Sequence, residues 1–173
     1  MSRINFDVKP FKIGNLTIIQ LPRDVSAKLP SRGMALISGT LNGSPFKAVL
    51  EPDGKGSHWL KADKTLPAFK SGETVKMSVE PSKDWPEPEV PADLTKAIKA
   101  SAKASDMWAM ITPMARWDWL RWIRSTKNPE TYKKHIEVAI SKMEHGERRP
   151  CCFNRNVCTV MEVSKNGALL DPA

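Results

Sequence analysis

Cysteine is scarce in this sequence: three occur among 173 residues, and Cys151, Cys152 and Cys158 lie close together. An odd number of neighbouring cysteines does not suit a disulfide framework and is typical of a reducing compartment. A structural zinc site requires four ligands in paired spacings, which two adjacent cysteines and the upstream His145 do not provide. We therefore expect free or packed thiols, no bound metal and no cofactor.

Long apolar stretches are also missing. The sequence has no run of about 18 apolar residues, which excludes a membrane-spanning helix. Its first residues, MSRINFDVKPF, lack the apolar segment of a secretory signal peptide. Both absences predict a cytoplasmic protein without membrane insertion.

Catalytic motifs are not recognisable either. No serine has a nucleophile-elbow pattern, and the glycines of NGSPF and DGKG are those of turns rather than of a phosphate-binding loop. His58 and His135 are isolated in the sequence, and only a carboxylate beside one of them would indicate acid–base chemistry. The sequence therefore predicts no catalytic residue and favours a binding protein over an uncharacterised enzyme.

The charge is strongly positive, at +8 with a pI of about 9.5. This balance permits contact with nucleic acid or with an acidic ligand. The cations are spread along the chain rather than gathered in one block. Nucleic-acid binding through the basic surface is therefore an alternative hypothesis rather than the first one.

The first half of the chain has the pattern of short strands. Asn42–Gly43 lies between two β-prone runs, which is the signature of a two-residue hairpin, and ETVKMSVEP alternates apolar and polar residues. Pro22 and Pro30 bracket one short helix. Residues 1–82 are therefore predicted to form a small β-barrel of about six strands, of double-split or Greek-key type.

The second half has a helical period. Four prolines in residues 81–91 predict a linker at 83–90, after which a helix begins near Pro91. Thr112 and Asn128 are candidate N-caps of two further helices, and Gly146 is a candidate C-terminal cap. The predicted fold class is therefore α+β. It comprises the barrel, the linker, a three-helix lobe at 91–146 and a tail at 147–173 that packs on the body.

The stretch MARWDWLRWIRSTKNPETYKKHI, residues 114–136, combines three tryptophans with several cations. On a helical wheel Arg116 falls inside an apolar arc. A charge on such a face must reach water, pair with a carboxylate, stack on tryptophan or bind an anionic ligand. The arc is formed by Trp119, Leu120, Trp122 and Ile123.

Three residues of this stretch lie away from the centre of the arc. We expect Arg121 and Arg124 to be solvated. Trp117 is expected to be an exposed platform for stacking, as used for single-stranded nucleic acid.

Two parts of the sequence resemble known families. The segment with SGTLNGSPF and GETVKMSVE resembles a small β-barrel domain of unknown function that is widespread in bacteria. The segment from VPADLTKAI to RRPCCF resembles the YdeI/OmpD-associated, or bacteriocin-protection, family. The matching positions are Pro91, Asp93, Leu94, Trp122, Ile123, Lys127, Glu130, Thr131 and Ile136.

The resemblance implies a barrel followed by a helical lobe, with a role in envelope stress and resistance to bacteriocins or cationic peptides. The sequence departs from the family pattern at Thr126, Tyr132 and His135, where relatives have alanine, arginine and arginine. A ligand role of those two arginines is therefore in doubt here.

These observations favour a non-enzymatic binding protein that confers resistance. It is expected to hold a small-molecule or peptide-like ligand, of antibiotic or bacteriocin type, in a cleft between barrel and lobe. The expected ligand-binding residues are Trp59, Lys61, Arg116, Trp117, Trp119, Lys127, Thr131, Tyr132 and His135.

Overall fold

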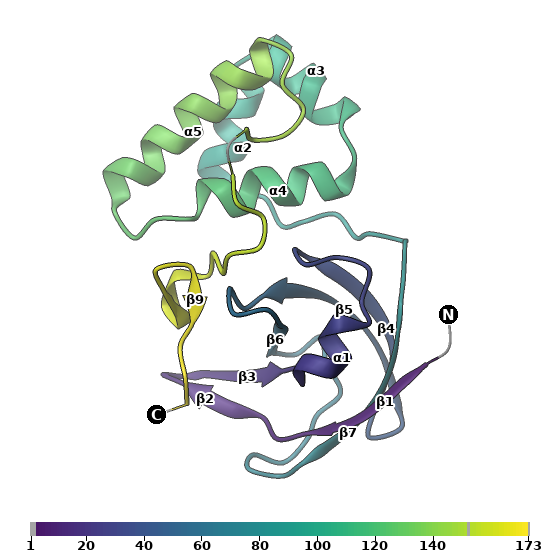
Figure 1. The fold of residues 1–173 in the computed structure, drawn as a ribbon. Helices are drawn as coiled ribbons and strands as arrows, with labels where there is room; N and C mark the ends of the chain where they lie inside the picture. The colour runs from purple at the N-terminus through teal and green to yellow at the C-terminus, as the bar shows by residue number, and fades with distance from the viewer. Residues whose placement is uncertain (1–2, 152, 173) are drawn as a thin grey trace. The chain divides into compact units, whose positions relative to one another are not determined.

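The computed structural model describes residues 3–151 and 153–172 and divides into two compact units (Figure 1). The barrel unit contains the chain up to Asp84 together with Arg155–Cys158 and the segment from Glu162 onward. The helical unit contains Trp85–Asn154 and Thr159–Met161. The α+β fold class predicted from the sequence is confirmed.

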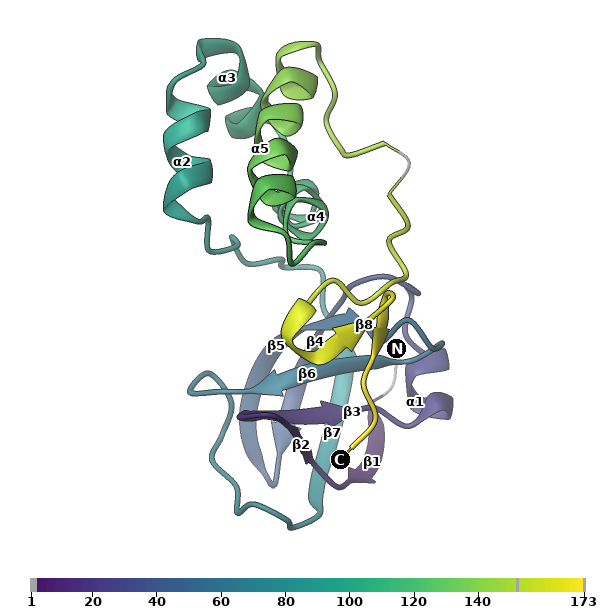
Figure 2. The ribbon, with the colours of Figure 1, turned by 90° about the vertical axis from the view of Figure 1, so that its left-hand side faces the viewer.

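A curled antiparallel sheet of seven strands forms the barrel unit (Figure 2). The order across the sheet is β1-β7-β4-β5-β6-β3-β2, so β1 and β2 lie at opposite edges. Only Lys9 and Pro10 separate these two strands in the chain, so the Cα atoms of Val8 and Phe11 are at most about 11 Å apart. The sheet must therefore curl until its edges approach, which gives a half-barrel. The strands are β1 (Ile4–Val8), β2 (Phe11–Ile13), β3 (Leu16–Gln20), β4 (Ala35–Leu41), β5 (Ser44–Pro52), β6 (His58–Ala62) and β7 (Val75–Pro81).

The seventh strand arises because the first β-prone run is divided. Pro10 has no N–H to donate to a neighbouring strand, so INFDVKPF does not continue as one strand. The chain turns there, and β2 forms a separate edge strand that pairs with β3.

The predicted hairpin is confirmed. Asn42 and Gly43 connect β4 to β5 with φ values of 49° and 84°, and Leu41 faces Ser44 across the turn. Two successive positive φ values belong to a type I′ turn, which the Asn-Gly pair favours. Alternate residues of the strands point into the core. The completely buried ones are Ile19, Ile37, Leu41, Leu50, Val75 and Val79.

The end of the chain returns to the turn between β5 and β6. A 3-10 helix (Met161–Val163) leads into a small hairpin of β8 (Ser164–Lys165) and β9 (Ala168–Leu169). The backbone N–H of Leu169 donates to the carbonyl of Asp53 at 2.8 Å. Gly54 lies so close to Gly167 that an added Cβ would be 1.9 Å from its carbonyl oxygen. Residues 53–54 and 167–169 therefore pack backbone against backbone.

Five helices occur in the described residues. Helix α1 (Arg23–Ala27) is the predicted short helix of the barrel unit, and helix α5 of the helical unit contacts the other three helices there (Figure 2). The predicted caps are confirmed, since Thr112 Oγ1 accepts from Ala115 N and Asn128 Oδ1 accepts from the first turn of α5. The helices of this unit are α2 (Ala92–Lys99), α3 (Ala102–Met110), α4 (Pro113–Ile123) and α5 (Pro129–Glu144).

The prediction of three helices in this lobe was wrong, because the first predicted helix is two. Ser101 has an extended backbone, with φ −126° and ψ 115°, and its hydroxyl accepts from Ala104 N at 3.2 Å. A serine that caps a new helix ends the one before it. In the part of the chain that the structure describes, no helix is long and apolar enough to cross a bilayer.

The expectation that Arg121 is solvated was also wrong. Its side chain is completely buried in the helical unit, and Nη1 lies 4.0 Å from Asp118 Oδ1. The guanidinium also lies over the ring of Phe153, 5.3 Å from its centroid. The helical wheel takes only the apolar arc of α4 into account. The face of α4 that carries Arg121 is in contact with Phe153, from the segment after α5.

Candidate functional site

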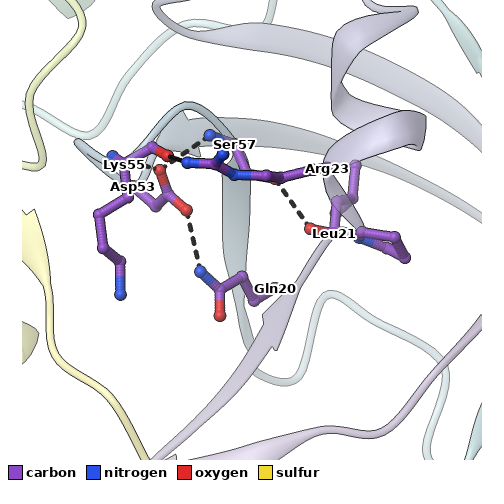
Figure 3. A pocket seen from close by; sticks show the side chains of 7 residues that line it. Gln20, Leu21, Arg23, Asp53, Lys55 and Ser57 are labelled. Atoms are coloured by element: carbon purple, nitrogen blue, oxygen red, sulfur yellow. Dashed lines mark hydrogen bonds between the residues drawn. The ribbon is translucent and has the colours of Figure 1, made fainter.

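A pocket of about 400 Å³ opens in the barrel unit, where the end of β3 meets the turn between β5 and β6 (Figure 3). A volume in this range suits a small ligand. The pocket combines two cations, one carboxylate, one amide and one hydroxyl with a small apolar wall. Its lining residues are Gln20, Leu21, Pro22, Arg23, Asp53, Lys55 and Ser57.

Asp53 organises this pocket. Its side chain is 1% exposed, and Oδ1 accepts from the backbone N–H groups of Lys55 at 2.7 Å and Ser57 at 2.9 Å. Oδ2 accepts from Gln20 Nε2 at 2.9 Å. A buried carboxylate is stable only with such donors, and each charge-assisted bond also fixes the backbone of the turn. The turn that lines the pocket is therefore preorganised.

The two cations of the pocket have different surroundings. Arg23 is exposed, and one Nη donates to the carbonyl of Lys55, so the guanidinium lies along the turn (Figure 3). The ammonium of Lys55 pairs with Asp171 at 3.1 Å. Ser57 Oγ donates to the carbonyl of Leu21 at 2.8 Å and thereby joins β6 to the end of β3. The pocket consequently has a rigid wall and a cationic rim.

The sequence did not predict this pocket. The DGKG pattern predicts a turn, and its aspartate close to two glycines is the signal that could have indicated a side chain bound to its own turn. Arg23 and Gln20 are about 30 residues away in the sequence and reach the turn only because β3 pairs with β6.

A buried serine–histidine pair lies next to this wall. Ser26 Oγ is 2.6 Å from His58 Nδ1, and His58 Nε2 is 2.8 Å from the carbonyl of Gly33. Because a carbonyl only accepts, Nε2 carries the proton and Nδ1 accepts from the serine. Ser26 and His58 are both completely buried, so the pair offers no surface to a substrate and functions as a packed polar contact.

Burial lowers the pKa of His58 below its ordinary value of 6.5, and the cation of Arg32 acts in the same direction. The hydrogen bond to Gly33 and the charge of Asp53 oppose this shift without reversing it. Below pH 6.5 the unfolded chain therefore takes up a proton that the folded chain does not, and stability falls with falling pH.

His58→Gln should flatten this pH dependence between pH 7 and pH 5. The expected change in slope is at most about 1.4 kcal/mol per pH unit, the value for one proton. Urea unfolding at each pH measures it, and slopes are compared because the variant also loses two hydrogen bonds. His145→Gln is the matched control, since His145 is exposed. An unchanged slope in His58→Gln would contradict the assignment.

Arg116 has the partners that its place on the apolar arc requires. Its Nη1 pairs with Glu87 at 2.6 Å, and Nε and Nη2 donate to the carbonyls of Trp108 at 2.9 Å and Ala109 at 3.2 Å. A guanidinium at the end of α3 satisfies carbonyls that lack helical partners. A ligand role for Arg116 stays a prediction, and such a ligand would compete with these contacts.

The two predicted tryptophans of α4 have different environments. Trp117 is half-buried rather than fully exposed, and its Nε1 donates to the carbonyl of Pro86 at 2.9 Å. Trp119 is completely buried, with Nε1 donating to the carbonyl of Arg148 at 2.9 Å. Trp119 therefore belongs to the core of the helical unit, while one side of Trp117 reaches solvent.

His135 forms an aromatic pair with Trp122. The rings stack with centroids 4.3 Å apart and an angle of 22°. His135 Nδ1 is 3.1 Å from the carbonyl of Ile123 and so carries the proton, which makes Nε2 the acceptor of the neutral ring. His135, a predicted site residue, thus contacts Trp122, which belongs to the apolar arc of α4.

The other predicted residues of α5 lie on its first turns or just before it. Lys127 and Thr131 are exposed. Tyr132 is half-buried, and its hydroxyl donates to Asp93 Oδ1 at 3.3 Å. Burial raises the pKa of Tyr132 above its ordinary value, and the charge of Asp93 adds to this shift. These positions remain candidate binding residues of the helical unit.

Trp59 and Lys61 belong to β6 of the barrel unit. Trp59 is 2% exposed and faces Gln20, a lining residue of the pocket, across the β3–β6 pair. Within the described residues, its Nε1 has no hydrogen-bond acceptor. Lys61 is exposed on the same strand. Neither side chain lines the pocket, and the predicted cleft between barrel and lobe stays a prediction.

The two cysteines that the structure describes have different environments. Cys151 is exposed, with Lys142 Nζ 3.1 Å from its sulfur, and Cys158 is buried. Cys152 lies outside the described residues. Across residues 3–151 and 153–172, no group of three or more His, Cys, Asp or Glu side chains is placed to hold a metal ion.

Two family models match the chain. Residues 87–146 match the family described as bacteriocin-protection, YdeI or OmpD-associated. Residues 7–79 match the domain of unknown function DUF1905. A comparison with curated proteins found no significant match. The two matched segments coincide with the helices α2–α5 and the half-barrel, so the chain contains a segment of the YdeI/OmpD-associated, bacteriocin-protection type and, before it, a DUF1905 domain.

Proposed function

We propose that this protein is a non-enzymatic, cytoplasmic binding protein that retains a small-molecule or peptide-like antibacterial compound and so confers resistance. The family description suggests a resistance-associated role. The observation that carries the proposal is the pocket of about 400 Å³ in the barrel unit. It is the right size for a drug-like ligand or for one end of a peptide.

The construction of the pocket wall supports binding. The carboxylate of Asp53 holds the turn at Lys55 and Ser57 through two backbone N–H groups, so the wall does not have to be ordered when a ligand enters. A preformed wall lowers the entropic cost of binding. Arg23 and Lys55 at the rim then provide charge for orientation and selectivity.

A thermal-shift screen against peptide and natural-product antibiotics tests this function. We expect at least one compound to raise the melting temperature of the wild-type chain, by mass action on the folded state. Lys55→Ala and Arg23→Ala should weaken that shift. Both side chains are on the rim, so neither change disturbs the core. A flat response across the panel would contradict the proposal.

Two further variants show which unit binds. Lys127→Ala and His135→Ala alter the candidate residues of the helical unit and leave the barrel pocket intact. If the barrel pocket is the site, they should retain the wild-type shift. Loss of the shift in these variants alone would move the site to the helical unit.

A further inference from the structure

The ammonium group of the pocket is already paired with a carboxylate from the end of the chain. Lys55 Nζ lies 3.1 Å from Asp171 Oδ1. The side chain of Lys55 is 34% exposed and that of Asp171 is 90% exposed. The pair thus joins a lining residue of the pocket to a carboxylate that is almost fully in solvent.

The backbone before Asp171 is held beside the pocket. Leu169 N donates to the carbonyl of Asp53, and Leu170 N donates to the carbonyl of Val163, both at 2.8 Å. Asp53 is the residue whose carboxylate organises the pocket wall. These two backbone hydrogen bonds hold the segment before Asp171 in place and so position its carboxylate beside Lys55. Because the side chain of Asp171 is exposed, separating it from Lys55 costs little free energy.

The remaining charges at the pocket favour an anion. The negative charge of Asp53 is buried and accepts from three donors. Arg23 adds a second cation at the rim, with one Nη used on the carbonyl of Lys55. A guanidinium and an ammonium around one pocket match the oxygens of a carboxylate or a phosphate.

We infer that the ligand of this pocket is anchored by an oxyanion, a carboxylate or a phosphate, which binds Lys55 in the place that Asp171 occupies in the free protein. The inference rests on the proposed function, in that it takes the barrel pocket as the ligand site. Asp171 then acts as an internal competitor that keeps the pocket closed to weak anions.

Nuclear magnetic resonance titrations with sodium acetate and with sodium phosphate test the inference. The amide signals of Lys55 and Ser57 are followed at constant ionic strength, with chloride as the balancing salt. Asp171→Asn should tighten binding of the anchoring anion about two- to fivefold, the range for an exposed ion pair. Lys55→Met should abolish it. Comparison of acetate with phosphate shows which oxyanion is preferred.

The chain contains a matched control. Lys47 and Asp84 form another surface pair of the barrel unit, at 3.0 Å, with side chains 38% and 95% exposed. Asp84→Asn changes the net charge by the same amount as Asp171→Asn and releases a lysine outside the pocket. It should leave the affinity measured at Lys55 and Ser57 unchanged.

The outcomes distinguish the oxyanion anchor at Lys55 from the proposed function in resistance. Equal affinities in wild type, Asp171→Asn and Asp84→Asn would overturn the inference, as would equal tightening in both variants. If compounds from the screen still bind in a Lys55-dependent way after either result, the proposed function stands without the oxyanion anchor. If the titrations give the expected pattern and no compound binds, the anion site stands and the resistance role fails.

Discussion

Replacement of Asp118 by asparagine should lower the free energy of unfolding of the helical unit by about 3–5 kcal/mol, the usual cost of breaking a buried ion pair. The side chain of Asp118 is 4% exposed and that of Arg121 is completely buried. Arg121 cannot lose its proton, so the variant leaves a buried charge without this counter-ion. Arg149, whose Nη1 is 3.1 Å from Asp118 Oδ2, loses the same partner.

Urea unfolding followed by tryptophan fluorescence measures this loss. Five of the six tryptophans belong to the helical unit, so the signal mainly reports that unit. Glu137→Gln is the matched control, because its pair with Lys134 is exposed and should be worth less than about 1 kcal/mol. Equal stability of the two variants would contradict the role of Asp118.

A double-mutant cycle separates the free energy of the Asp118–Arg121 ion pair from that of side-chain packing. Asp118→Leu combined with Arg121→Met replaces both charges by apolar groups, and such replacements are often neutral or stabilising. The double variant should therefore be more stable than the sum of the single changes implies, by about 1–3 kcal/mol. Additive losses would show that Asp118 acts through its other contacts instead.

Features that depend on neighbouring residues could be predicted from the sequence. The Asn42–Gly43 hairpin follows from positive φ preferences at two adjacent positions. The starts of α4 and α5 follow from a capping side chain before a proline, at Thr112 and Asn128. The resemblance to the two families likewise follows from the order of the motifs along the chain, and the two family matches confirm it.

Features that depend on distant segments could not be predicted. Arg121 is buried partly because the chain after α5 returns to α4, where Phe153 lies against Arg121 and the carbonyl of Arg148 accepts from Trp119. The hydrophobic pattern of α4 alone cannot predict these contacts, because the residues that make them follow α5. The pocket likewise requires the pairing of β3 with β6 and the return of the chain end to Asp53.

The largest expected effect in the barrel unit is that of Gly39→Ala, which should cost at least about 3 kcal/mol. Gly39 lies in β4, between β7 and β5, opposite Val79 and Phe46. A Cβ at this position would be 1.8 Å from the carbonyl oxygen of Ser78 and 2.9 Å from the Cα of Val79. Both are backbone atoms of β7, so no side chain can move to make room.

Strands β4 and β7 must move apart to accept the methyl group, so the substitution weakens the hydrogen bonds between these two strands. Hydrogen exchange of the Asn42 and Ser82 amides measures it, because these N–H groups donate to Lys76 and Leu36 across the β4–β7 boundary.

Gly14→Ala is the control for backbone strain alone. Gly14 has a φ of +57° and no atom within 4 Å of an added Cβ, so alanine there should cost only about 1–2 kcal/mol. Faster exchange at Asn42 and Ser82 in Gly39→Ala, but not in Gly14→Ala, would show that the glycine of the SGTLNG motif is required by the close approach of β4 and β7. Equal exchange rates in the two variants would show that the sheet accommodates a side chain at residue 39.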